Sequence, residues 1–309
     1  MNNINIAMII ISCAFVAVAF SLVLESRRAW RDKGYAMLGI NYAILALVLG
    51  VILGRLYYFL IDVNNVDANF FVTNMQFGSF GVLAGCIIAA FIISIVYRVS
   101  FARLLDISVT PLLLLVIFTR VSDFFIGTNF GRAVEEGGIM KFPFAVFMPV
   151  GRGGMWLSAV FFYEFVFCML LLIAAMFLRR NNGKGFNFAY FIGLYCAGRI
   201  VFESMRQDSL YIGFVKISQI VSAVGVVAVI IVLLVFGALK KNIKLPMIIA
   251  IPVVMVAAVG ITVYCEFAMG TEIAALCTSV MAACMAVLGI ILTYEYIKLF
   301  KKSVDISSK

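Results

Sequence analysis

The sequence predicts an all-α polytopic membrane protein, and three observations lead to this fold class. Hydrophobic residues make up 65% of the 309 residues and charged residues only 13%, whereas roughly a quarter of the residues in a soluble domain are charged. Apolar runs long enough to cross a bilayer core of about 30 Å recur along the whole chain. These runs are continuous and do not alternate with polar residues, which favours helices over the strands of a barrel.

Nine such runs are expected to form membrane-spanning helices. They lie near residues 5–24, 36–61, 80–97, 108–127, 157–178, 188–206, 217–238, 246–267 and 273–297. No basic segment precedes the first run and no small-residue cleavage site follows it, so we interpret it as a retained helix and not as a signal peptide. Small residues in SFGVLAG (79–85), at the start of the third run, are expected to let helices pack closely.

The distribution of basic residues predicts the orientation of the chain. Most of the 24 Lys and Arg residues lie in every second connection between the predicted helices: Arg27, Arg28, Arg31, Lys33, Arg98, Arg103, Arg179, Arg180, Lys184, Lys240, Lys241, Lys244, Lys298, Lys301, Lys302 and Lys309. Because Lys and Arg accumulate on the cytoplasmic side, we expect the N-terminus outside and the C-terminus inside. The formal charge of +9 therefore indicates topology and contact with anionic membrane lipids, and we expect no nucleic-acid partner.

Several kinds of chemistry are absent from the sequence. The chain contains no histidine, which excludes a histidine-ligated metal or haem and any mechanism with a histidine base. Its 7 cysteines occur singly in apolar runs and are interpreted as packing residues, because they lack the spacing of a metal site. No nucleotide-binding glycine pattern and no Gly-x-Ser-x-Gly turn is present. We therefore expect neither a metal nor a cofactor.

Three charged residues interrupt the sixth predicted helix, in the segment GRIVFESMR (198–206). Arg199 and Glu203 are four residues apart and Glu203 and Arg206 are three apart, so all three share one helix face. An arginine at mid-membrane costs about 2.5 to 3.5 kcal/mol on insertion scales, so such residues are usually paired or face a polar cavity. Two interpretations stay open: a structural ladder of ion pairs, or an anion site in which Glu203 orients guanidinium groups for a phosphate.

Further polar residues interrupt three other predicted helices. In TRVSDFFIGTNFGR (119–132), Arg120 and Asp123 are spaced for pairing, and the glycines permit tight turns close to a ligand. The polar loop that continues to residue 152 is either a gate or an ordinary surface loop. Buried tyrosines and a carboxylate are suitable partners for arginines, and such residues occur elsewhere, namely Tyr58 near Arg55 in the second helix, and Tyr163 and Glu164 in the fifth.

The order of these motifs resembles that of the bacterial prolipoprotein diacylglyceryl transferases. The similarity spans roughly residues 5–238, and its most specific segments are GRIVFESMR (198–206) and ISQIVS (217–222). The family transfers the diacylglyceryl group of phosphatidylglycerol to the lipobox cysteine of a preprolipoprotein, which forms a thioether and releases glycerol 1-phosphate. The resemblance therefore implies a lipid transferase, with phosphatidylglycerol and a lipobox peptide as substrates, in the bacterial cytoplasmic (inner) membrane.

The resemblance also implies a domain division and a set of site residues. Residues 1–240 would form a seven-helix transferase-like core, and residues 241–309 a two-helix extension with a basic cytoplasmic tail. Catalytic roles are implied for Arg120, Arg199 and Asp123, and substrate-binding roles for Arg55, Gly131, Tyr163, Glu164, Glu203 and Arg206. The arginines would stabilise the phosphate leaving group. The thiol proton would pass to Asp123 or Glu203, or be lost because of the positive field.

The chain differs from the family pattern at several positions. Gly78 or Gly81 stands where the family has a histidine, Asp123 replaces an asparagine, Thr128 a later acidic residue, and AVFFYE a Pro-Ser-Gln-Leu-Tyr-Glu segment. A second hypothesis is therefore a non-catalytic homologue that binds lipid or a partner protein. A third, a transporter for an anionic amphiphile, lacks the internal repeat that such folds often show.

Overall fold

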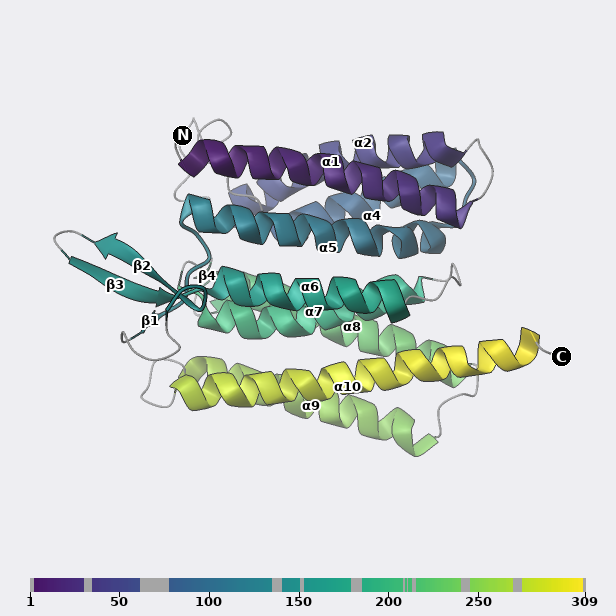
Figure 1. The fold of residues 1–309 in the computed structure, drawn as a ribbon. Helices are drawn as coiled ribbons and strands as arrows, with labels where there is room; N and C mark the ends of the chain where they lie inside the picture. Colours follow the sequence, from purple (N-terminus) through teal and green to yellow (C-terminus); the bar gives the residue numbers. More distant parts are fainter. Residues whose placement is uncertain are drawn as a thin grey trace. The chain divides into compact units, whose positions relative to one another are not determined.

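The computed structural model describes residues 3–30, 35–61, 78–134, 141–150, 153–178, 185–207, 209, 211–212, 215–239, 245–268 and 274–307. Within these ranges the chain forms nine helices (Figure 1): α1 (Asn3–Ala29), α2 (Tyr35–Ile61), α4 (Ser79–Val96), α5 (Phe101–Ile126), α6 (Val160–Leu178), α7 (Phe186–Met205), α8 (Ile217–Leu239), α9 (Leu245–Ala268) and α10 (Ala274–Ser307). The predicted all-α class is confirmed.

Eight of these nine described helices are long and apolar enough to cross a membrane. The prediction of nine such spans therefore needs one correction, at α7. This segment is helical as predicted, but it contains Arg199 and Glu203 and is the described helix that is not among the long apolar ones. The multi-pass character is confirmed, while the predicted orientation, with the N-terminus outside, stays a prediction.

The chain divides into two compact units, each of which is described by itself. The first unit comprises Met1–Phe188 and Gln207–Ile217, and the second comprises Ala189–Arg206 and Ser218–Lys309. The second unit thus joins most of α7 and α8 to both helices of the C-terminal extension. This division does not coincide with the boundary predicted at residue 240, and the assignment of functional domains stays a prediction.

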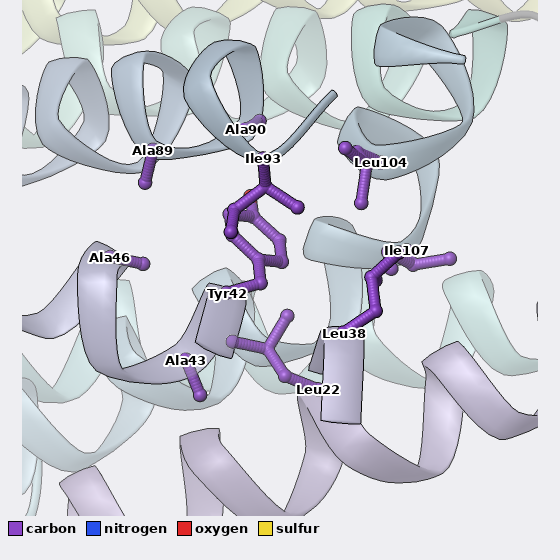
Figure 2. Packing of buried hydrophobic residues seen from close by; sticks show 10 residues of the cluster. All are labelled: Leu22, Leu38, Tyr42, Ala43, Ala46, Ala89, Ala90, Ile93, Leu104 and Ile107. Carbon is purple, nitrogen blue, oxygen red and sulfur yellow. The ribbon is translucent and has the colours of Figure 1, made fainter. Parts of the chain in front are cut away.

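An apolar cluster forms the core of the first unit among α1, α2, α4 and α5 (Figure 2). Its buried members are Leu22, Leu38, Tyr42, Ala43, Ala46, Ala89, Ala90, Ile93, Leu104 and Ile107. The Tyr42 hydroxyl shares a hydrogen bond of 2.6 Å with the hydroxyl of Ser108 on α5. The hydroxyl group of Tyr42 therefore has a hydrogen-bond partner inside the core, as buried hydroxyl groups generally do.

Glycines of α4 allow its backbone to lie directly against α2. A Cβ at Gly85 would lie 2.6 Å from the backbone nitrogen of Gly50, and a Cβ at Gly81 would lie 2.3 Å from the carbonyl oxygen of Leu53. Because these atoms belong to the backbone, no change of rotamer can relieve the overlap. The close helix packing predicted from SFGVLAG is therefore confirmed.

A carboxylate on α5 determines where α7 begins. Asp106 is buried, and its two carboxylate oxygens accept hydrogen bonds from the backbone N–H groups of Gly185 at 3.0 Å and Phe188 at 3.1 Å. The first N–H groups of a helix lack partners within the helix, and a negative charge there is favourable. The side chain of α5 thus caps the helix that carries Arg199.

Two small antiparallel sheets accompany the helices in the described part of the chain. One has the strand order β1 (Ala133–Val134), β3 (Gly153–Ser158), β2 (Ala145–Val150), and the other pairs β4 (Tyr211–Ile212) with β5 (Val215–Lys216). In Figure 1, β2 and β3 extend beyond the ends of α5 and α6. The sequence predicted only a polar loop between the fourth and fifth helices. The strands form because Phe147 and Trp156 pair across the ladder, with ring centroids 5.6 Å apart.

Substitution Gly85→Leu is expected to separate α2 from α4 and to lower the melting temperature of the detergent-solubilised protein. The added side chain meets the backbone of Gly50, and overpacking of this kind costs about 1 to 3 kcal/mol or more. Gly260→Leu is the matched control, because nothing lies within 4 Å of a Cβ at Gly260. Equal melting temperatures for the two variants would contradict the close packing of α4 on α2.

Candidate functional site

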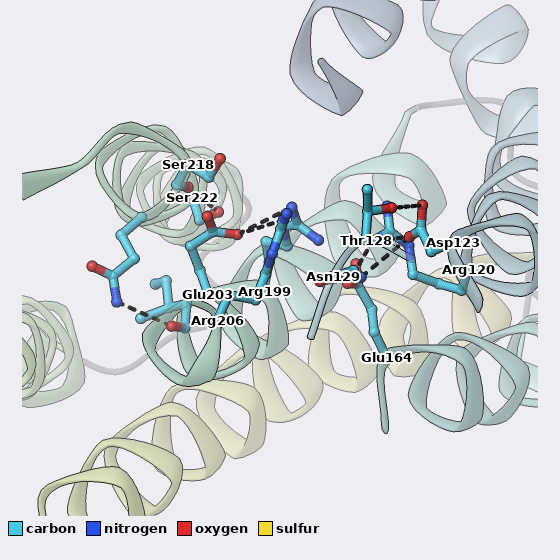
Figure 3. Close-up of polar contacts among 12 residues, drawn as sticks. Arg120, Asp123, Thr128, Asn129, Glu164, Arg199, Glu203, Arg206, Ser218 and Ser222 are labelled. Carbon is cyan, nitrogen blue, oxygen red and sulfur yellow. Dashed lines mark hydrogen bonds and ion pairs between the residues drawn. The ribbon is translucent and has the colours of Figure 1, made fainter. Parts of the chain in front are cut away.

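Arg199, Glu203 and Arg206 form an ion-pair ladder at the C-terminal end of α7, in the second unit. Glu203 Oε2 lies 3.1 Å from Arg199 Nη2 and 3.3 Å from Arg206 Nη1 (Figure 3). Arg199 is 3% exposed and Glu203 1% exposed. The pairing predicted from the spacing is therefore confirmed, and we call these three residues the arginine ladder.

The arginine ladder carries a net positive charge in an apolar setting. One carboxylate contacts two guanidinium groups, so the three formal charges sum to plus one. A buried charge is strongly disfavoured unless it is paired and hydrogen-bonded. The shared carboxylate thus stabilises both arginines.

Gln219 of α8 links α7 to α9 beside the arginine ladder. Its side-chain Nε2 donates to the carbonyl oxygen of Ile200 at 3.3 Å and to Glu266 Oε2 at 2.9 Å. Ile200 directly follows Arg199, and Gln219 lies in the ISQIVS segment (217–222) singled out by the sequence analysis. These contacts hold the backbone of α7 at the ladder.

A second arginine cluster lies at the C-terminal end of α5, in the first unit. Arg120 Nη1 lies 2.7 Å from Asp123 Oδ2 and 3.5 Å from Oε2 of Glu164, which comes from α6 (Figure 3). Arg120 is 8% exposed, and Glu164 is fully buried. The predicted pairing of Arg120 with Asp123 is confirmed, and Glu164 adds a carboxylate from a second helix.

The turn after α5 directs further donors to Asp123. Gly127 ends the helix with φ +82° and Asn129 has φ +64°, both in the left-handed region. Thr128 Oγ1 then donates to Asp123 Oδ1 at 3.1 Å, and Asn129 Nδ2 donates to Asp123 Oδ2 at 3.3 Å. Asp123 therefore contacts three donors, and with Arg120, Thr128, Asn129 and Glu164 it forms what we call the Arg120 cluster.

The structure places Gly131 and Tyr163 next to the small sheet. The backbone N–H of Gly131 donates to the carbonyl of Ser158 at 2.8 Å, and the Tyr163 hydroxyl donates to the carbonyl of Phe144 at 2.9 Å. Gly131 thus joins the strand ladder and Tyr163 holds the segment before β2. Their predicted roles in substrate binding stay predictions.

The structure describes the other residues predicted for the site only in part. Arg55 is buried in α2 of the first unit, while the side chain of Tyr58 lies outside the described residues. Much of the predicted gate also lies outside them, including Glu135, Glu136 and Arg152. The role of a gate stays a prediction.

Gly78 and Gly81, one of which is expected at the position of the family histidine, are tightly enclosed. At Gly78 a Cβ would lie 2.1 Å from Cδ1 of Tyr57. At Gly81 the obstacle is the backbone of α2, as described above. In this fold the ring of Tyr57 and the α2 backbone fill the space that a larger side chain would need.

Three polar residues of these clusters were not assigned a role from the sequence. Asn129 follows a Gly-Thr pair, and Asn is enriched in the left-handed conformation that such turns use. Gln219 was recognised only as one residue of the ISQIVS motif (217–222). Glu266 lies alone in the apolar run of α9, where a carboxylate is as conspicuous as an arginine.

Each of the two clusters contains arginine and carboxylate groups, and the chemistry of each suits anions. Among the residues that the structure describes, no group of three or more Cys, Asp or Glu side chains is arranged to hold a metal. Guanidinium groups held by carboxylates present planar donors that match the oxygens of a phosphate. The arrangement therefore favours recognition of a phosphate or a carboxylate.

Comparisons with known proteins agree with this chemistry. A family model described as prolipoprotein diacylglyceryl transferase matches residues 5–235. Relatives named phosphatidylglycerol–prolipoprotein diacylglyceryl transferase, from Clostridium kluyveri and Clostridium botulinum (strain Langeland), are 28% identical over 203 and 208 residues. The alignments cover 64% and 66% of this chain and 80% and 81% of the relatives.

The matched segment contains α1 to α8 almost completely, and so both arginine clusters, whereas α9 and α10 lie beyond it. The eight apolar helices and the bacterial relatives place the protein in the bacterial cytoplasmic membrane as a multi-pass protein. Because the match covers about three quarters of its length, the chain belongs to the prolipoprotein diacylglyceryl transferase family.

Proposed function

We propose that this protein transfers the diacylglyceryl group of phosphatidylglycerol to the lipobox cysteine of a prolipoprotein. The observation that carries the proposal is the arginine ladder, with two guanidinium groups held by one buried carboxylate. The printed names of the relatives, which include both phosphatidylglycerol and prolipoprotein, support the choice of substrates.

The arginine ladder is suited to the phosphodiester of the lipid. The phosphodiester carries a single negative charge, which matches the net charge of Arg199, Glu203 and Arg206. When the bond to the glyceryl carbon breaks, a further negative charge develops on the phosphate. A fixed positive site stabilises this transition state more than the bound lipid, which is the condition for a faster reaction.

The proposed reaction forms one bond and breaks one. The cysteine sulfur attacks the glyceryl carbon that carries the phosphate, and a carbon–sulfur bond forms. The carbon–oxygen bond to the phosphate breaks, and its electron pair leaves with glycerol 1-phosphate. The thiol proton is released to water, because a positive field favours the thiolate.

We assign positioning roles to the carboxylates. Glu203 orients Arg199 and Arg206, while Asp123 and Glu164 orient Arg120 from two helices. Asp123 already contacts three donors, which supports this role over that of a proton acceptor. Arg120 itself keeps the catalytic role that the family resemblance implies.

A second candidate function is lipid binding without transfer. The enclosed positions of Gly78 and Gly81 favour it, because the family histidine has no room there. In that case the arginine ladder would bind phosphatidylglycerol, and no thioether would form.

Substitution Arg199→Lys is expected to lower kcat/KM of diacylglyceryl transfer by roughly 30- to 150-fold. Lysine keeps the charge but loses the planar fork, and a charge-assisted hydrogen bond contributes about 2 to 3 kcal/mol. The measurement is mass spectrometry of the peptide thioether formed in proteoliposomes. Arg28→Lys is the matched control, because the Arg28 side chain is 71% exposed.

Equal rates for the Arg199→Lys variant and the parent protein would contradict a role of the guanidinium geometry. A parent protein that forms no thioether, yet binds phosphatidylglycerol only when Arg199 is present, would establish the second candidate function instead.

Substitution Glu203→Gln is expected to destabilise the protein by about 3 to 5 kcal/mol, because the buried guanidinium group of Arg199 and the partly buried one of Arg206 lose their shared carboxylate. The melting temperature in detergent measures this loss. Phosphatidylglycerol is expected to restore part of it, since the lipid phosphate replaces the missing charge. A variant as stable as the parent protein would show that Glu203 does not hold the arginines.

A further inference from the structure

The C-terminal extension contacts α7 although it lies outside the family-matched segment. The match ends at residue 235, but α9 and α10 belong to the same compact unit as most of α7 and α8. The extension is therefore in a position to influence the helix that carries the arginine ladder.

Helix α10 holds the beginning of α7. Near that end, the Tyr190 hydroxyl shares a hydrogen bond of 3.1 Å with Thr293. The Tyr190 ring also stacks on Tyr296, with centroids 4.2 Å apart and an interplanar angle of 12°. A Cβ at Gly193 would lie 3.2 Å from Leu292. These contacts fix α7 about two turns before Arg199.

Helix α9 holds the other end of α7, through Gln219. The side-chain nitrogen of Gln219 has two hydrogens, and its two acceptors are the Ile200 carbonyl and the Glu266 carboxylate. Only the NH₂ end of the amide can satisfy both acceptors, so Glu266 selects its orientation. The bond to Glu266, at 2.9 Å, is the shorter of the two.

Glu266 lies near the C-terminal end of the apolar span Pro246–Phe267 of α9. The α9 helix has a high mean hydropathy, and Glu266 is its one charged residue. Glu266 accepts a hydrogen bond from Gln219, and Gln219 also donates to the backbone carbonyl of Ile200, the residue after Arg199. The C-terminal extension thus contributes a polar contact within the second unit, which contains the arginine ladder.

We propose that Glu266, in the extension, is a positioning residue for Arg199 and acts through Gln219. The inference rests on the proposed function for its effect on transfer, while its structural part, the restraint on α7, stands independently. The extension is then a part of the site that the matched family segment does not contain.

A double-substitution cycle in the full chain tests the inference. The variants are Glu266→Ala, Gln219→Ala and both together, with Phe267→Ala, a side chain 66% exposed, as the neighbouring control. Each variant is measured for hydrogen–deuterium exchange of the peptide 198–206 and for diacylglyceryl transfer in proteoliposomes. Effects of residues that act through one contact are not additive.

We expect faster exchange in the peptide 198–206 for both single variants, and no further increase in the double variant. We expect kcat to fall by about tenfold and KM to change less, since a displacement of about 1 Å can lower a rate by roughly a hundredfold. Glu266→Gln should retain most of the activity, because its amide oxygen still accepts from Gln219. A merely structural role predicts equal loss in Glu266→Gln and Glu266→Ala.

Unchanged exchange in Glu266→Ala, or additive effects in the double variant, would overturn the inference. If the parent protein forms no thioether, the proposed function fails, but the exchange measurement still decides whether Glu266 restrains α7.

Discussion

The contact of one carboxylate with two guanidinium groups is the interaction on which the site depends. Glu203 pairs with Arg199 on α7 and with Arg206, which directly follows this helix; Arg199 is buried and Arg206 is partly buried. This helix carries charged residues where the other described helices have a long apolar run. Its neighbours must therefore support it, and Asp106 at its start and Gln219 near its end do so.

In both arginine clusters carboxylates pair with guanidinium groups, but the carboxylates come from different parts of the fold. In the second unit the carboxylate and both arginines come from one helix, so the 3.6-residue period brings them together. In the first unit Arg120 receives Asp123 from its own helix and Glu164 from α6. Each guanidinium is held in a defined direction by acceptors, which is what recognition of a phosphate requires.

The sequence predicted those features that depend on local spacing. Continuous apolar runs revealed the helices, and intervals of three and four residues revealed the ladder. The sheet of β1, β2 and β3 was missed although β2 and β3 are neighbours in the chain and pair from Val150 with Gly153, because the segment was interpreted as a polar loop; only β1 pairs with a distant segment. Glu266 was missed because its contact with Gln219 spans 47 residues, although its charge in an apolar run was a usable signal.

Transfer of the diacylglyceryl group by the purified parent protein is the most direct test of this account. The protein is reconstituted with phosphatidylglycerol and a lipobox peptide, and mass spectrometry follows the peptide and glycerol 1-phosphate. The account predicts equal amounts of peptide thioether and glycerol 1-phosphate, with both products lost in Arg199→Ala. A folded parent protein that forms neither product, beside an active transferase of the family, would contradict it.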